Sequence, residues 1–192
     1  RSTTHSYDPL GRRSQTQDPL GGLLATTYDS QDQPLRITDP RGLSTTYDPN
    51  VWGDVQRLDS PDTRSTVTSY DPAGNPLQQI DARGVSVTQS YDALNRNTTR
   101  LYPDSQQQFR YDRSTNGKGL LTGLQDSSGS QTYTYTQRRQ LRQHTVNLAG
   151  LPSLSVGYGY GKGGRLSRIS YPSGRTATYS YRADGTLSQL RT

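Results

Sequence analysis

The chain has 192 residues, enough for one ordinary domain, and its 22 basic and 16 acidic side chains give a net charge of +6. Only 28% of the residues are hydrophobic, but 14 Tyr add apolar ring area, so we expect an ordered structure with a thin core rather than a disordered chain. The sequence has no Cys, which excludes disulfides, and no apolar run long enough to span a membrane. Because the chain begins with Arg1 and contains no Met, we expect it to be a piece of a longer polypeptide.

A Tyr-Asp dipeptide recurs along the chain with a nearly fixed spacing of about 20 to 24 residues, which is typical of a repeat architecture. The clear copies are Tyr7-Asp8, Tyr28-Asp29, Tyr47-Asp48, Tyr70-Asp71, Tyr91-Asp92 and Tyr111-Asp112. The register continues without Asp at Tyr135, Tyr160 and Tyr181. The spacing predicts one repeat segment over residues 1–192, with about nine repeats and no separate second domain.

One repeat, residues 70–92, shows the local structure that we expect. Asp71-Pro72-Ala73-Gly74 predicts a tight turn, because Asp binds the backbone downstream, Pro presets φ and Gly accepts a positive φ. A second turn of the same form follows at residues 81–84, and residues 85–91 alternate as a strand does. Each repeat therefore predicts two turns and two strands, and no window has the period of a helix.

Turns this short cannot make the crossovers of parallel strands, so the strands are expected to run antiparallel, each beside the next. The prediction is an all-β fold: a meander of β-hairpins, about 18 strands in total, that curls into a spiral sheet. A parallel β-helix is the competing fold, which the ten-residue spacing of the turns disfavours.

The recurring residues are interpreted as structural. The aspartates occupy first positions of turns, where the side chain accepts bonds from the backbone, and the turn glycines accept positive φ. The tyrosines are expected to stack in rows across neighbouring strands. The alternative is that such aromatic rows stack on sugar rings. These structural positions include, besides the six Tyr-Asp pairs above, Gly11, Gly74, Gly174, Tyr179 and Tyr181.

Two segments interrupt the repeat. Residues 47–53 carry two extra residues and the single Trp52, and residues 111–121 lengthen another turn. Longer loops are where binding tends to occur, so Trp52 marks a possible binding loop. The alternative is that Trp52 only plugs the sheet.

No residues combine into a catalytic, metal or cofactor site, so we predict a protein that is not an enzyme. His5 and His144 have no metal-ligating companion at a useful spacing, and no nucleophile elbow occurs. Residues 157–164 are rich in Gly but lack the ending of a phosphate-binding loop. The arginines are dispersed rather than clustered, which disfavours a nucleic-acid partner.

The repeated Tyr-Asp-x-x-Gly motif, with its second turn and Tyr-x-Tyr return, resembles the YD-repeat of the Rhs (rearrangement hotspot) family over essentially the whole chain. Residues 70–77 and 169–181 fit the motif closely. The family includes bacterial Rhs toxins, the C components of Tc toxin complexes, and teneurins.

The resemblance implies a spiralling sheet that closes into a hollow shell, with flanking repeats of the parent shell chain and an enclosed toxin polypeptide as partners. It also implies a protein that is secreted, or delivered by a bacterial secretion system, and that protects a C-terminal toxin until delivery. An adhesin-like module that binds carbohydrate or a cell surface is the alternative function.

Overall fold

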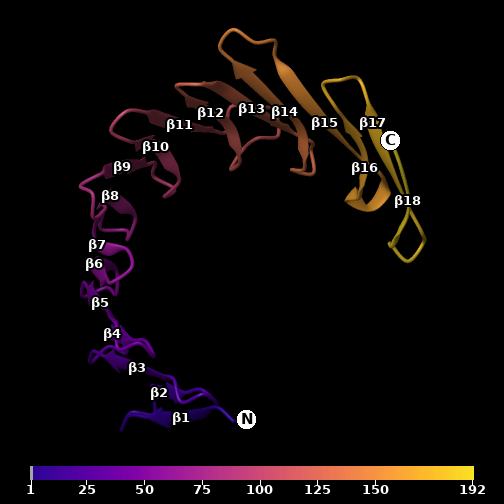
Figure 1. The fold of residues 1–192 in the computed structure, drawn as a ribbon. Coiled ribbons are helices and arrows are strands. Elements are labelled where there is room, and N and C mark those ends of the chain that lie inside the picture. The colour runs from indigo at the N-terminus through magenta and orange to yellow at the C-terminus, as the bar shows by residue number, and fades with distance from the viewer. Residues whose placement is uncertain (1) are drawn as a thin grey trace. The chain divides into compact units, whose positions relative to one another are not determined.

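A computed structural model describes residues 2–192, which form eighteen β-strands and one short 3-10 turn, Lys162–Gly164. All eighteen strands belong to one antiparallel sheet, and the all-β prediction is confirmed (Figure 1). The first nine strands are β1 (Thr4–Tyr7), β2 (Arg13–Gln17), β3 (Leu23–Tyr28), β4 (Pro34–Thr38), β5 (Ser44–Pro49), β6 (Val55–Ser60), β7 (Arg64–Tyr70), β8 (Pro76–Ile80) and β9 (Ser86–Tyr91). The remaining nine are β10 (Asn97–Leu101), β11 (Gln106–Tyr111), β12 (Leu121–Asp126), β13 (Gly129–Tyr135), β14 (Leu141–Leu148), β15 (Leu154–Tyr160), β16 (Leu166–Ser170), β17 (Thr176–Tyr181) and β18 (Leu187–Arg191).

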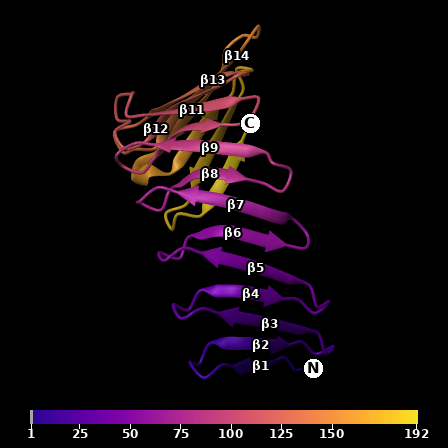
Figure 2. The ribbon, with the colours of Figure 1, turned by 90° about the vertical axis from the view of Figure 1, so that its left-hand side faces the viewer.

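The chain divides into two compact units, which are described separately. The N-terminal half contains β1 to β9 and runs to Arg96, together with Leu101–Pro103. The C-terminal half contains β10 to β18 and comprises Asn97–Arg100 and Asp104–Thr192. Within the N-terminal half each strand pairs antiparallel with the next in sequence, as Figure 2 shows for β1 to β9. The C-terminal half has the same order from β11 to β18.

The register separates the side chains onto two faces, because successive residues of a strand point to opposite sides of the sheet. In the C-terminal half, Gly123 lies opposite Thr132, and Thr132 opposite Thr145, on the side that we call the polar face. Tyr133 lies opposite His144 on the other side, the aromatic face. The same register places the following strand residues on the polar face: Gln108, Arg110, Gly123, Gln125, Ser130, Thr132, Thr134, Gln143, Thr145, Asn147, Ser155, Gly157, Gly159, Arg168, Ser170, Thr176, Thr178, Ser180, Gln189 and Arg191.

The apolar core of the described residues is thin. Ala177, which is 2% exposed, is the buried hydrophobic residue, and no large side chain is fully buried. A single-layered sheet has no second layer to cover its faces, so backbone hydrogen bonds and turn chemistry carry much of its order.

The turn at Asp71–Gly74 shows how each hairpin is closed. The carboxylate of Asp71 accepts hydrogen bonds from the backbone N–H groups of Ala73 and Asn75, both at 2.9 Å. The N–H of Gly74 donates to the carbonyl of Asp71 at 3.0 Å, and Gly74 has a φ of 81°. The same pair of carboxylate bonds recurs at Asp8, Asp18, Asp29, Asp39, Asp81 and Asp92.

The turn expected at Tyr47-Asp48 lies two residues further along the chain. Strand β5 continues to Pro49, and Asn50 takes the first turn position, where its side-chain oxygen accepts bonds from the N–H groups of Trp52 and Asp54. Asp48 therefore lies within the strand, opposite Arg57, and does not close the turn. Asn50 can take the first turn position because its side-chain oxygen caps a turn as that of Asp does. The two extra residues of this repeat therefore lengthen strand β5.

A β-bulge accompanies the first turn of a repeat wherever the strand register is given, a feature that the sequence did not predict. In the hairpin β7–β8, Ser69 pairs with Gln78, but Tyr70 pairs with Pro76, so Leu77 is skipped. Equivalent shifts occur in the pairs β1–β2, β3–β4, β5–β6, β11–β12, β13–β14, β15–β16 and β17–β18. A bulge leaves one residue outside the regular ladder and increases the local twist.

Candidate functional site

The repeated tyrosines close the open ends of hairpins. The hydroxyl of Tyr70, at the end of β7, donates to the carbonyl of Val55, the first residue of β6, at 2.9 Å. The turn of this hairpin lies at its other end, so the tyrosine acts as a staple between the two strand ends. The same bond joins Tyr28 to Arg13, Tyr91 to Pro76, Tyr111 to Asn97, Tyr135 to Leu121, Tyr160 to Leu141 and Tyr181 to Leu166, over 2.6 to 3.0 Å.

The carbonyl that accepts each staple belongs to a bulge wherever the strand register is given. Val55, for example, is paired with Pro49 across the bulge of β5–β6. Because the ladder is interrupted there, the tyrosine hydroxyl supplies a hydrogen-bond partner to a backbone group that the regular ladder does not serve.

The expected rows of stacked tyrosines do not form. Among residues 2–192 the stacked ring pair is Tyr133 with His144, whose centroids lie 4.7 Å apart. The repeated tyrosines sit on every second strand, so they are about 10 Å apart, beyond the 4.5 to 7 Å range of ring pairs. Arginines take the space beside some of these rings: Arg12 lies over Tyr28, and Arg165 over Tyr181.

Three turn carboxylates, Asp71, Asp81 and Asp92, have depressed pKa values, which follow from the bonds that they accept. The side-chain amide of Asn75, together with backbone N–H groups, lowers the pKa of the Asp71 carboxyl. The guanidinium of Arg96 has the same effect on the pKa of Asp92, and that of Arg83 on the pKa of Asp81. These three carboxylates are therefore engaged in holding turns.

Trp52 does not plug the sheet. Its side chain is 86% exposed at the tip of the Asn50–Gly53 turn, and its backbone N–H donates to Asn50. The last position of this turn favours glycine, because Gly53 has a φ of 90°. The exposed indole leaves the binding-loop interpretation of Trp52 open and removes the structural alternative.

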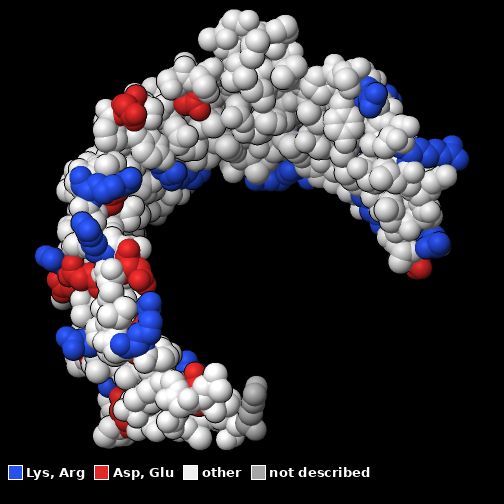
Figure 3. All heavy atoms as spheres, viewed as in Figure 1, with Lys and Arg blue, Asp and Glu red and all other residues white. Residues whose placement is uncertain are grey.

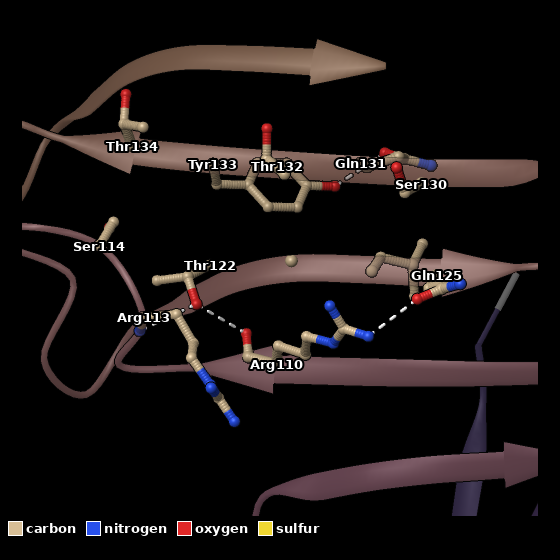
Figure 4. Close-up of a pocket in the computed structure, with 12 residues that line it drawn as sticks. Arg110, Arg113, Ser114, Thr122, Gln125, Ser130, Gln131, Thr132, Tyr133 and Thr134 are labelled. Atoms are coloured by element: carbon tan, nitrogen blue, oxygen red, sulfur yellow. Dashed lines mark hydrogen bonds between the residues drawn. The ribbon is translucent and has the colours of Figure 1, made fainter. Parts of the chain in front are cut away.

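The lengthened loop after β11 lies against a shallow cavity in the C-terminal half. The loop is held to the sheet by Thr122, which accepts a bond from the N–H of Arg113 and donates to the carbonyl of Arg110. Asp112 accepts from the N–H of Gly119 and so closes the loop on itself. The cavity is about 690 Å³ and is lined mainly by hydroxyl, amide and guanidinium groups, among them Arg110, Arg113, Gln125, Thr132 and Thr134 (Figure 4).

A second shallow cavity, of about 710 Å³, has an aromatic lining. Tyr135, Tyr158 and Tyr160 contribute to it, with Arg142 and Lys162. Tyr135 and Tyr160 are staples, so their hydroxyls are engaged. Tyr158 lies opposite Ile169 in the sheet and is half-buried.

Charge is distributed very unequally between the two halves. The N-terminal half carries 9 basic and 12 acidic side chains, whereas the C-terminal half carries 13 basic and 4 acidic ones. Figure 3 shows the two signs side by side over β1 to β9 and mostly basic side chains over β14 to β18. Ion pairs are formed by Arg12, Arg41, Arg57, Arg83 and Arg96, all of which lie in the N-terminal half.

The two histidines have structural neighbours. His5 hydrogen-bonds Thr16, and His144 hydrogen-bonds Gln131 while it stacks on Tyr133. Within residues 2–192 no group of three metal-ligating side chains comes together. No helix of this part of the chain is long and apolar enough to cross a membrane.

The comparisons with known proteins agree with this geometry. The family model described as the teneurin YD-shell matches residues 1–192, while no curated protein matches the chain. The crystal structure of the TcdB2-TccC3 complex is similar to this chain with a TM-score of 0.62 and 15% identity, over 98% of this chain and 14% of that one. A mutant holotoxin pore of the Photorhabdus luminescens Tc toxin gives the same values.

The chain therefore spans about one seventh of the length of the solved chains that it matches. At 15% identity, the structural similarity to these chains shows a shared fold alone. The family model, by contrast, covers every residue of the sequence. The chain belongs to the teneurin YD-shell family.

Proposed function

We propose that residues 1–192 form part of the wall of a YD-repeat shell that encloses a C-terminal toxin effector until delivery, as one continuous repeat segment without a second domain. The observation that carries this proposal is the tyrosine staple, which recurs in seven hairpins. The repeated side chains are used to hold strands together. This is the arrangement of a scaffold rather than of a reaction centre.

The partners of such a wall are the flanking repeats of the parent shell and the enclosed polypeptide. Its site residues are structural: tyrosine staples such as Tyr28, Tyr91 and Tyr111, and turn residues such as Asp8 and Gly174. The proposed wall has no catalytic activity and needs no cofactor. It acts outside the bacterium or in the target cell, since the enclosed toxin is protected only until delivery.

Protease protection tests the proposal in the full-length protein. If this segment is shell wall, the effector polypeptide resists protease in the native protein and becomes cleavable when the sheet is weakened by Gly74→Val. The matched variant Gly11→Ala also replaces a turn glycine, but with a residue that has no β-branch. It is expected to preserve most of the protection. Rapid cleavage of the effector in the native protein would contradict enclosure.

Carbohydrate binding is the second candidate function, supported by the exposure of Trp52 and by the aromatic cavity that contains Tyr158. Aromatic rings stack on the apolar faces of sugars, and both side chains offer a ring that no staple engages. A glycan array separates the two functions. Hits that are lost in Trp52→Ala or Tyr158→Ala, but kept in Leu10→Ala at another exposed turn tip, would establish a lectin-like role, and the absence of hits would remove it.

A further inference from the structure

Two arginines on the polar face of the C-terminal half lie directly across from glycines. Arg110 of β11 is paired with Gly123 of β12, and Arg168 of β16 is paired with Gly159 of β15. Both arginines are exposed. Each guanidinium therefore projects beside a position of the sheet that carries no side chain.

The backbone does not require glycine at these positions. Gly123 and Gly159 lie within strands, and neither has a positive φ. A Cβ atom on Gly123 would meet nothing closer than 3.5 Å, so Ala fits there without displacement, whereas a Cβ atom on Gly159 would lie 3.3 Å from the Cβ of Arg168. Strand glycines weaken a sheet, and they often mark a place where a ligand or another backbone approaches closely.

Neither arginine has an acidic partner in the part of the chain that the structure describes. Arg110 donates to the neutral amide oxygen of Gln125 at 2.8 Å (Figure 4). No carboxylate pairs with Arg168. Within residues 2–192 neither Arg110 nor Arg168 takes part in an ion pair, so these two cations remain available for an external anion.

We propose that the polar face of the C-terminal half binds an extended acidic polypeptide, whose carboxylates are held by Arg110 and Arg168. Arginine suits this ligand because its planar fork binds a carboxylate through two parallel bonds. The neighbouring Gln125, Ser130 and Thr132 provide donors and acceptors for a peptide backbone, and the two glycines let that backbone approach the sheet. The binding of an acidic polypeptide to this face does not require that the polar face line the inside of a shell.

The composition of the face favours a peptide over other polyanions. The strand residues of this face include no Phe, Tyr or Trp, so there is no platform on which nucleic-acid bases stack. They also include no large aliphatic residue that would insert into a membrane surface.

The spacing of the two arginines sets the pattern of the ligand. Five strand spacings separate β11 from β16, a distance of about 24 Å across the sheet. The register aligns Arg110 with Ser155 of β15, whereas Arg168 pairs with Gly159, so the two arginines are also offset by four residues, about 13 Å, along the strands. The direct distance of about 27 Å is covered by about eight residues of an extended chain. The ligand is therefore expected to carry two acidic groups about eight residues apart, and not one compact acidic cluster.

Fluorescence anisotropy with a labelled Gly-Ser peptide that carries Glu at two positions about eight residues apart tests the proposal. The peptide is expected to bind, and Arg110→Gln combined with Arg168→Gln should weaken binding about tenfold or more. The matched control, Arg138→Gln combined with Arg175→Gln, removes the same charge from exposed positions near turns and should leave affinity within about twofold. Gly123→Ala should weaken binding while the circular dichroism spectrum stays unchanged.

Equal losses in the two double variants would overturn the proposal, because they would indicate attraction to net charge alone. So would tighter binding of a single-stranded oligonucleotide or of phosphatidylserine vesicles than of the peptide. Equal affinity for a peptide with adjacent Glu residues would contradict the two-site geometry.

Discussion

The hydroxyl of Tyr70 donates a hydrogen bond to the carbonyl of Val55 at 2.9 Å and so closes the open end of the hairpin β6–β7. The turn at Ser60–Arg64 fixes one end of this hairpin, and the tyrosine fixes the other. Since the acceptor lies in a bulge, the bond serves a carbonyl outside the regular ladder. The repeat is thus a hairpin closed at both ends.

Removing one staple should destabilise the sheet measurably. Tyr70→Phe deletes the hydroxyl and keeps the ring, and we expect it to lower the free energy of unfolding by about 1 kcal/mol in urea titrations. Tyr47 is the matched control, because β5 runs two residues past it and its position at the bulge is taken by Pro49. Tyr47→Phe should change stability by less than about 0.5 kcal/mol. Equal effects of the two variants would show that the staple contributes nothing specific.

The shifted turn gives a second pair of variants. Asn50→Ala removes the acceptor for the N–H groups of Trp52 and Asp54 and should cost about 1 to 2 kcal/mol. Asp48→Ala, in the neighbouring strand, should cost less than about 0.5 kcal/mol. Urea denaturation of both proteins checks the assignment. If Asp48→Ala were the more damaging change, the turn would begin at the Tyr-Asp dipeptide after all.

Much of this fold can be read from the sequence, because the strongest signals are local. Asp71 and Gly74 define a turn through bonds and dihedral angles that span four residues, and such turns force antiparallel pairing. The bulges could not be predicted in this way. Whether Tyr70 pairs with Pro76 or Leu77 depends on contacts between two strands, and hydrophobic alternation is weak in a sheet with so thin a core.

The residues of the two proposed binding surfaces were harder to predict for a similar reason. Trp52 is conspicuous in the sequence, but only the position of the Asn50 turn shows that its ring is exposed. Arg110 and Gly123 are 13 residues apart in the chain and become neighbours through the register of β11 and β12. A clue was present in the charge asymmetry between the halves, which composition averaged over the whole chain conceals.

Gly74→Val should damage folding. Gly74 has a φ of 81°, where a β-branched residue is strained, although the nearest atom to an added Cβ is the Asp54 carboxylate oxygen at 3.6 Å. The cost is therefore conformational, and we expect about 2 kcal/mol or more. Thermal unfolding followed by circular dichroism measures it. An unchanged midpoint would refute the left-handed assignment of this turn residue.

Stability should be greatest between about pH 4 and pH 10. The pKa values of Asp71, Asp81 and Asp92 are lower in the folded protein than in the unfolded chain. Their contribution to the free energy of unfolding is therefore present above the pKa of the unfolded chain, and it is lost as pH falls through the pKa of the folded protein. Burial raises the pKa of Tyr70 and Tyr160 in the folded protein. Their contribution to the free energy of unfolding is therefore present below the pKa of the unfolded chain, and it is lost as pH rises through the pKa of the folded protein. Urea midpoints across this range would show a plateau, and a maximum outside it would contradict the roles of these groups.

The end strands should make the isolated chain associate. All residues of β1 and β18 are exposed, and a strand at a sheet edge presents unpaired backbone groups to another chain. Sedimentation velocity is expected to show association that grows with concentration, and Leu190→Lys in β18 should reduce it. A cooperatively folded monomer at high concentration would remove the main support for a segment that needs flanking repeats.

Single-particle imaging of the full-length protein that carries this sequence tests the central claim most directly. The account predicts that residues 1–192 form contiguous wall in a closed shell, with density for a polypeptide inside it. An open sheet with no enclosed density, or a wall whose strands are not joined by tyrosine staples, would contradict the account.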